Sequence, residues 1–182
     1  MDVAEDSRIH VLRERQEALR SLFLIQQRAV FLALLVATFV APLTAIISSP
    51  DSDDTTTESR GLFASIGYFF DNDAEAFGDR ETHPHGLDAG LIASRIGLVL
   101  LLIAVLCAIV ASLAFWAGRS RGAKPTQIVL AIVLIIAAGL VFLGLTWLPD
   151  SDQGTSATGW LWLPIAAGMW SFYQVWSSNR LE

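Results

Sequence analysis

Four long apolar runs, none of which contains a charged side chain, constrain the fold of this chain more than any other feature. Each run is 19 to 23 residues long. A helix rises about 1.5 Å per residue, so about 20 residues cross the roughly 30 Å hydrocarbon core of a bilayer. Because the runs are continuously apolar and do not alternate with polar residues, they favour helices over barrel strands. The sequence therefore predicts an all-α integral membrane protein with four transmembrane helices, at residues 29–47, 96–118, 128–148 and 160–178.

Charge is distributed unevenly among the segments that connect these runs. Nine of the twelve basic residues lie before the first run, between the second and third, or after the fourth. The positive-inside rule places those segments in the cytoplasm, so both termini are expected there. Residues 48–88 carry ten acidic residues against two basic ones, a balance of −8, and are expected to form an acidic loop on the outer side.

Four spans leave little of a 182-residue chain for a separate soluble domain, so we expect one membrane domain over residues 29–178. Residues 1–28 are predicted to form a cytoplasmic amphipathic helix, which either lies on the inner surface or continues directly into the first span. Residues 179–182 would be a cytoplasmic tail. A signal peptide is the competing interpretation of the N-terminus, but a retained anchor fits its length better.

Small residues recur on the predicted spans at intervals that let two helices approach closely. In the second span Ala104 and Ala108 lie four residues apart. In the third span Gly139 and Gly144 have no side chain, so the helix is narrower at those positions. Pro42 removes a backbone donor from the first span, so we expect a bend near it. The first span carries a stripe of alanines, which we expect to form a helix-packing face: Ala33, Ala37, Ala41 and Ala45.

The predicted outer loop contains a short apolar segment among its acidic residues. Five apolar side chains lie on one helical face within Gly61–Phe70, a segment too short to span a bilayer. We expect an interfacial helix there, or alternatively an aromatic anchor for a partner domain. The residues expected to bind a partner are aromatic side chains of this segment and nearby carboxylates: Asp51, Asp53, Asp54, Phe63, Phe69, Phe70, Asp71 and Asp73.

Two histidines in the same loop are the residues best suited to ligate a metal ion. His83 and His85 flank Pro84, and several carboxylates are near in sequence. Two imidazoles and a carboxylate could hold Zn²⁺ or Cu²⁺. Because no third ligand is specified, we favour a solvated polar loop and keep a metal site as the alternative.

Ionisable groups are nearly absent from the apolar stretches. Arg95 is embedded in one, but it lies close enough to the outer boundary to extend to it or to pair with a loop carboxylate. The predicted spans contain no Asp, Glu, Lys or His, and Cys107 is the only cysteine. These patterns argue against a proton relay, an intramembrane haem bound by imidazole and a thiol relay. We therefore expect neither enzymatic activity nor a cofactor.

Contact with other proteins is the function left by this elimination. We expect a non-catalytic accessory or assembly subunit of a larger membrane complex, with respiratory assemblies as the first candidates and secretion or cell-envelope machinery as the second. Eleven Arg against one Lys is typical of a GC-rich bacterial genome, so we expect a bacterial inner membrane. Its acidic loop would attract a positively charged extracytoplasmic protein, and its spans would contact lipid; no nucleic-acid partner is expected.

Two other functions remain open. One is a small oligomeric transporter or channel, with Arg95 at its mouth and Gln127 and Gln174 among its polar lining. The other is an extracytoplasmic metal-binding sensor that uses His83 and His85.

Overall fold

The computed structural model of the chain describes residues 3–48, 56–72, 86–116, 123–148 and 155–179. These residues are mostly helical, as predicted, but the expectation of an entirely α-helical chain is wrong because one end carries a small sheet. The elements are α1 (Val3–Val40), β1 (Pro42–Ser48), β2 (Thr56–Gly61), α2 (Leu62–Asp71), α3 (Gly86–Trp116), α4 (Ala123–Trp147), β3 (Thr155–Ala157), the 3₁₀-helix η2 (Gly159–Leu161) and α5 (Trp162–Asn179).

Three of the described helices are long and apolar enough to cross a membrane. The qualifying segments are His10–Val40 of α1, Asp88–Ala114 of α3 and Pro125–Trp147 of α4. α5 is only 18 residues long and more polar, so a fourth crossing stays a prediction. α3 also begins ten residues before the predicted start of its span, which leaves Arg95 well inside the helix.

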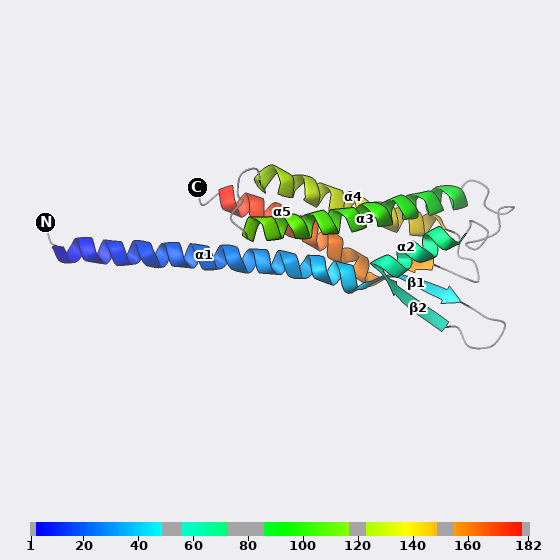
Figure 1. Cartoon of the computed structure of the whole chain (residues 1–182), viewed down its shortest axis with the longest axis horizontal. Coiled ribbons are helices and arrows are strands. Elements are labelled where there is room, and N and C mark those ends of the chain that lie inside the picture. The colour runs from blue at the N-terminus through cyan, green and yellow to red at the C-terminus, as the bar shows by residue number, and fades with distance from the viewer. Residues whose placement is uncertain (1–2, 49–55, 73–85, 117–122, 149–154, 180–182) are drawn as a thin grey trace.

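The helices pack side by side, and successive long helices run in opposite directions (Figure 1). α1 begins, and α5 ends, at one end of the bundle, whereas α2 and the sheet lie at the other (Figure 1). α1 is one continuous helix, so the predicted N-terminal helix runs directly into the first span. Its N-terminal half extends beyond the bundle (Figure 1).

The first predicted span is wrong at its outer end. α1 ends at Val40, and Pro42 begins β1 instead of bending a helix. Proline has no amide to donate and disfavours a helical conformation of the preceding residue, Ala41. Because Ala41 and Ala45 lie outside the helix and Ala33 is exposed, the four alanines do not form one helical stripe. The buried face of α1 is formed instead by Gln27, Phe31, Leu35 and Thr38.

Small residues bring α3 and α4 together, as predicted for Gly144, but the prediction for Gly139 is wrong because a Cβ atom added there would have no neighbour within 4 Å. A Cβ atom added to Gly97 would lie 2.7 Å from the backbone nitrogen of Val141, and one added to Gly90 would lie 2.9 Å from the carbonyl oxygen of Gly144. Ala104 and Ala108 are buried on the same face of α3. The two backbones are therefore nearly in contact, which dispersion forces favour where lipid offers no hydrophobic drive for association.

The sheet and α2 form a small compact unit at the end of the bundle, which we call the cap. Its strand order is β2-β1-β3, with both pairs antiparallel, so β1 is central. Leu43 of β1 and both Leu62 and Phe69 of α2 are fully buried in the cluster that continues into the bundle. The cap is thus held by the same core as the helices.

Candidate functional site

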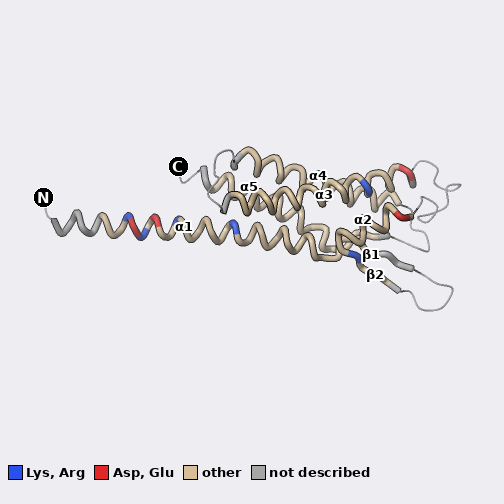
Figure 2. Tube along the Cα trace, in the orientation of Figure 1, with Lys and Arg blue, Asp and Glu red and all other residues tan. Residues whose placement is uncertain are grey.

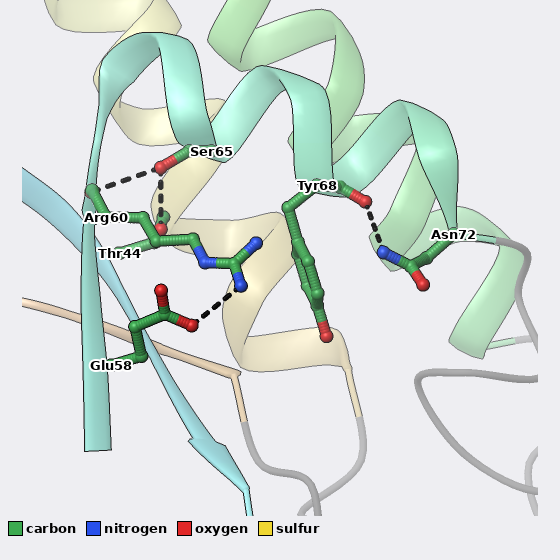
Figure 3. Close-up of polar contacts among 6 residues, drawn as sticks. All are labelled: Thr44, Glu58, Arg60, Ser65, Tyr68 and Asn72. Atoms are coloured by element: carbon green, nitrogen blue, oxygen red, sulfur yellow. Dashed lines mark hydrogen bonds and ion pairs between the residues drawn. The ribbon is translucent and has the colours of Figure 1, made fainter. Parts of the chain in front are cut away.

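A buried hydroxyl pair joins α2 to the sheet in the cap. Ser65 Oγ lies 2.7 Å from Thr44 Oγ1 and 3.2 Å from the carbonyl oxygen of Arg60 (Figure 3). It also donates to the carbonyl oxygen of Gly61 at 2.8 Å. Neither hydroxyl is accessible to water, so an unpaired one would carry a desolvation cost. The pair therefore fixes the position of α2 on β1.

Arg60, at the end of β2, is held against the outer side of α2. Its guanidinium lies 4.5 Å from the ring centroid of Tyr68 and 2.7 Å from a carboxylate oxygen of Glu58 (Figure 3). Burial raises the pKa of the Tyr68 hydroxyl above its ordinary value, and the positive charge of Arg60 partly opposes that shift. The Glu58 side chain is exposed, so this ion pair adds little to stability.

Arg95 reaches from α3 to the C-terminal end of α2. Its Nε donates to the carbonyl oxygen of Phe69 at 2.6 Å, and its Nη2 donates to that of Asn72 at 2.9 Å. The last carbonyls of a helix lack intrahelical partners and carry partial negative charge, which a guanidinium satisfies. Arg95 therefore has the expected structural role, but its described partners are backbone carbonyls and not a loop carboxylate.

An open groove runs along α3 beside Arg95. Its volume is about 380 Å³, and the Arg95 guanidinium lies 5.5 Å from the ring centroid of Phe70 at its edge. The residues that line it are Phe70, Ile92, Arg95, Ile96, Val99 and Leu100. Every one of them except Arg95 is apolar, and the exposed surface of the groove is entirely apolar, so Arg95 lines it through its carbon atoms while its guanidinium lies beside it.

A polar contact joins α1 to α5 inside the bundle. The carbonyl oxygen of Gln27 accepts from Gln174 Nε2 at 2.6 Å and from Trp170 Nε1 at 3.0 Å. Gln27 and Gln174 are both buried. The sequence did not predict the role of Gln27, although a glutamine at the start of an apolar run was a visible signal. Since the Gln174 side chain lies between two helices, it lends no support to a pore lined by that residue.

Replacing Gln174 with leucine should weaken this contact between helices. The substitution keeps the volume and removes the donor to Gln27, so we expect a loss of about 1 kcal/mol in the free energy of unfolding. This loss is measured by titrating the protein in mild detergent with SDS and following unfolding by circular dichroism. Phe172→Leu, at an exposed neighbouring position on α5, is the control. Identical midpoints for both variants would show that the contact contributes nothing.

The structure separates the residues predicted to bind a partner. The helix predicted over 61–70 is present as α2, but Phe69 is fully buried whereas Phe63 and Phe70 are 56% and 53% exposed. Phe69 therefore belongs to the core and has no exposed surface with which to contact a partner. Asp71 is exposed at the end of α2. Asp51, Asp53, Asp54 and Asp73 lie outside the described residues.

The remaining predicted site residues are not brought together. Ala33 is exposed and Ala37 is half-buried on α1, so neither is part of its main buried face. His83 and His85 lie outside the described residues. Within the described part of the chain, no three His, Cys, Asp or Glu residues come close enough to hold a metal ion.

The class of protein is indicated by the long apolar helices and not by a set of catalytic residues. Three apolar helices of spanning length define a multi-pass membrane protein, with a small α/β cap at one end. Comparison with protein-family models, with curated proteins and with solved structures found no match.

Proposed function

We propose that the chain is a non-catalytic accessory or assembly subunit of a larger membrane complex, and that a partner protein docks on the N-terminal half of α1. The observation that carries this proposal is an exposed apolar stripe on a helix that extends beyond its own bundle. Leu12 and Leu19 are 65% and 67% exposed, and Val11 is exposed beside them.

The length of α1 supports a position of Leu12 outside the hydrocarbon core, with Leu19 near its boundary. The helix has 38 residues and is about 57 Å long, whereas a hydrocarbon core takes about 30 Å. Measured back from Val40, Leu19 lies at about 31 Å and Leu12 at about 42 Å. A straight helix that continues into a span cannot lie flat on the bilayer, so lipid is a poor cover for Leu12.

The charges around the stripe fit a protein partner with acidic side chains. Arg13, Arg15 and Arg20 lie on the same part of α1 and are all exposed. Charged residues gather along this half of α1 and at the cap, whereas the helices between are almost free of them (Figure 2). An acidic amphipathic helix would cover the leucines and neutralise the arginines together.

Two of the three helices that could cross the membrane carry few ionisable side chains. The qualifying segment of α4 contains no charged residue, and that of α3 contains only Asp88 and Arg95. Arg95 is engaged with the end of α2. Polar side chains that contact other helices, such as Gln174, hold the helices together. In this proposal the subunit therefore depends on its partners for any catalysis.

The proposal includes an orientation and a cellular setting. We place both termini in the cytoplasm and the cap outside a bacterial inner membrane, because nine of the twelve basic residues lie before the first apolar run, between the second and third, or after the fourth. Respiratory complexes are the first candidates for the partner assembly. The acidic segment 48–88 would then attract a basic extracytoplasmic protein, through an attraction that weakens with salt.

Site-specific photocrosslinking in native membranes tests the docking surface. A crosslinker placed at Leu12 or Leu19 should form an adduct with a subunit of the complex that copurifies in mild detergent. The matched controls are His10 and Glu17, which have the same seven-residue spacing and lie on the opposite face of α1. They should give far weaker adducts.

Substitution provides the second test of the same surface. Leu12→Lys with Leu19→Lys should abolish copurification while leaving the fold unchanged, because both side chains are exposed in the isolated chain. His10→Lys with Glu17→Lys should leave copurification intact. Recovery of the wild-type chain only as a free monomer, with no adduct at any of the four positions, would refute the proposed function.

A further inference from the structure

We propose that the groove beside Arg95 is a binding site for an anionic phospholipid, with an acyl chain along α3 and the phosphate against the guanidinium. The site does not depend on the proposed docking function. It combines three observations: an apolar groove, a cation without a carboxylate partner among the described residues, and a depth that a lipid headgroup can reach.

The groove has the dimensions and surface of a small-molecule site. Its volume of about 380 Å³ falls in the range of roughly 300–1,000 Å³ that is usual for ligand pockets. Ile92 and Ile96 on its wall are 54% and 50% exposed, and they face outward from the bundle. Because α3 is a candidate span, the medium available to fill this groove is lipid.

Arg95 retains hydrogen-bonding capacity toward a ligand. A guanidinium has five N–H donors, and the two described hydrogen bonds of Arg95 use Nε and Nη2. No carboxylate of the described residues forms an ion pair with it. The planar fork is suited to phosphate oxygens, and a phosphate would neutralise a charge that is costly near hydrocarbon.

The position of Arg95 along α3 matches a headgroup in the leaflet next to the cap. α3 has 31 residues, about 46 Å, and Arg95 lies nine residues, about 14 Å, from its start. If the helix is centred on a 30 Å core, Arg95 lies about 5 Å below the boundary. An arginine side chain can reach the interface from that depth.

The contacts with α2 hold the guanidinium in place for such a ligand. The carbonyl oxygens of Phe69 and Asn72 fix two of its nitrogens, and Phe70 lies against its face. A cation already ordered by the protein loses less side-chain entropy when a phosphate binds. A soluble anion would use the cation alone, whereas a lipid would also fill the apolar groove, so we commit to the lipid.

Native mass spectrometry of the purified full-length chain tests the site. The protein in mild detergent is offered phosphatidylglycerol, phosphatidylcholine with the same acyl chains, or glycerol 3-phosphate. We expect phosphatidylglycerol to be retained about tenfold more than phosphatidylcholine, because the choline cation of phosphatidylcholine leaves its headgroup with no net charge to neutralise Arg95. Glycerol 3-phosphate should not be retained. Equal retention of the two lipids, or binding of glycerol 3-phosphate as tight as that of the lipid, would overturn the proposal.

Variants separate the contribution of the groove from that of the charge. Arg95→Gln should abolish the preference for the anionic lipid, and Arg95→Lys should retain part of it because the charge remains without the fork. Val99→Trp fills the groove and leaves the Arg95 contacts intact, so it decides the question even if Arg95→Gln fails to fold. The matched control is Ile103→Trp, at an exposed position of α3 outside the groove. Unchanged lipid retention in Val99→Trp would refute the site.

Discussion

Gly144→Ala should destabilise the protein, although alanine is the better helix former. A Cβ atom at this position would lie 2.6 Å from the backbone nitrogen of Ser94 and 2.8 Å from the carbonyl oxygen of Gly90, and it would also collide with Ser94 Oγ. Backbone atoms cannot rotate away, so α3 and α4 must separate. Overpacking of this kind costs about 1–3 kcal/mol, and it acts on the most extensive interface among the described helices.

Gly139→Ala is the control for this prediction on the same helix. A Cβ atom at Gly139 would have no neighbour within 4 Å, so the substitution should gain up to about 1 kcal/mol from helix propensity. SDS titration followed by circular dichroism should therefore move the two unfolding midpoints in opposite directions. Equal shifts would mean that α3 and α4 do not approach each other as closely as described.

The long helices could be predicted from the sequence because each is encoded locally. The apolar runs that correspond to α3 and α4 are continuous, and a helix is the structure that satisfies every backbone group within one such segment. α2 could also be predicted, since its five apolar residues follow the 3.6-residue period. The small residues indicated close packing of helices, and Ala104, Ala108 and Gly144 are buried where α3 meets α4, but the sequence did not name the pair of helices and Gly139 takes no part.

The sheet could not be predicted in the same way because its pairing is long-range. Leu43 and the apolar residues after it continue the first run, so hydropathy gives no sign that the helix has ended. Pro42 is a signal in the sequence, but its lack of a backbone N–H is equally compatible with a kinked helix and with the end of a helix. β1 pairs with β3, more than one hundred residues later, and β3 is too short to give a signal of its own.

The contacts of the candidate site depend on the fold and not on a motif. Arg95 could be recognised as an unusual cation, but its partners are the carbonyls of Phe69 and Asn72, which any sequence would supply. Thr44 lies in the predicted first span and Ser65 in the apolar segment of the loop, so nothing in the sequence pairs them before α2 is placed on β1. The sequence pattern placed Phe63, Phe69 and Phe70 on one face, whereas the structure buries only the second.

Phe69→Ala should therefore cost about 3–5 kcal/mol in the free energy of unfolding, the largest effect among the substitutions proposed. Phe69 is fully buried and packs with the cluster that joins the cap to the bundle. Removing a phenyl ring from such a site loses its transfer free energy and leaves a cavity that the neighbours fill only in part. The cap should loosen first, because α2 would lose its central anchor.

Phe70→Ala is the matched control, one residue later on the same helix. Phe70 is 53% exposed, and its ring lies against the Arg95 guanidinium, so we expect a loss of about 1 kcal/mol or less. Thermal unfolding of both variants in the same detergent compares them directly, and limited proteolysis of β2 and α2 reports on the cap alone. If Phe69→Ala and Phe70→Ala unfold at the same temperature, α2 is not seated as described, and the geometry of Arg95 and its groove fails with it.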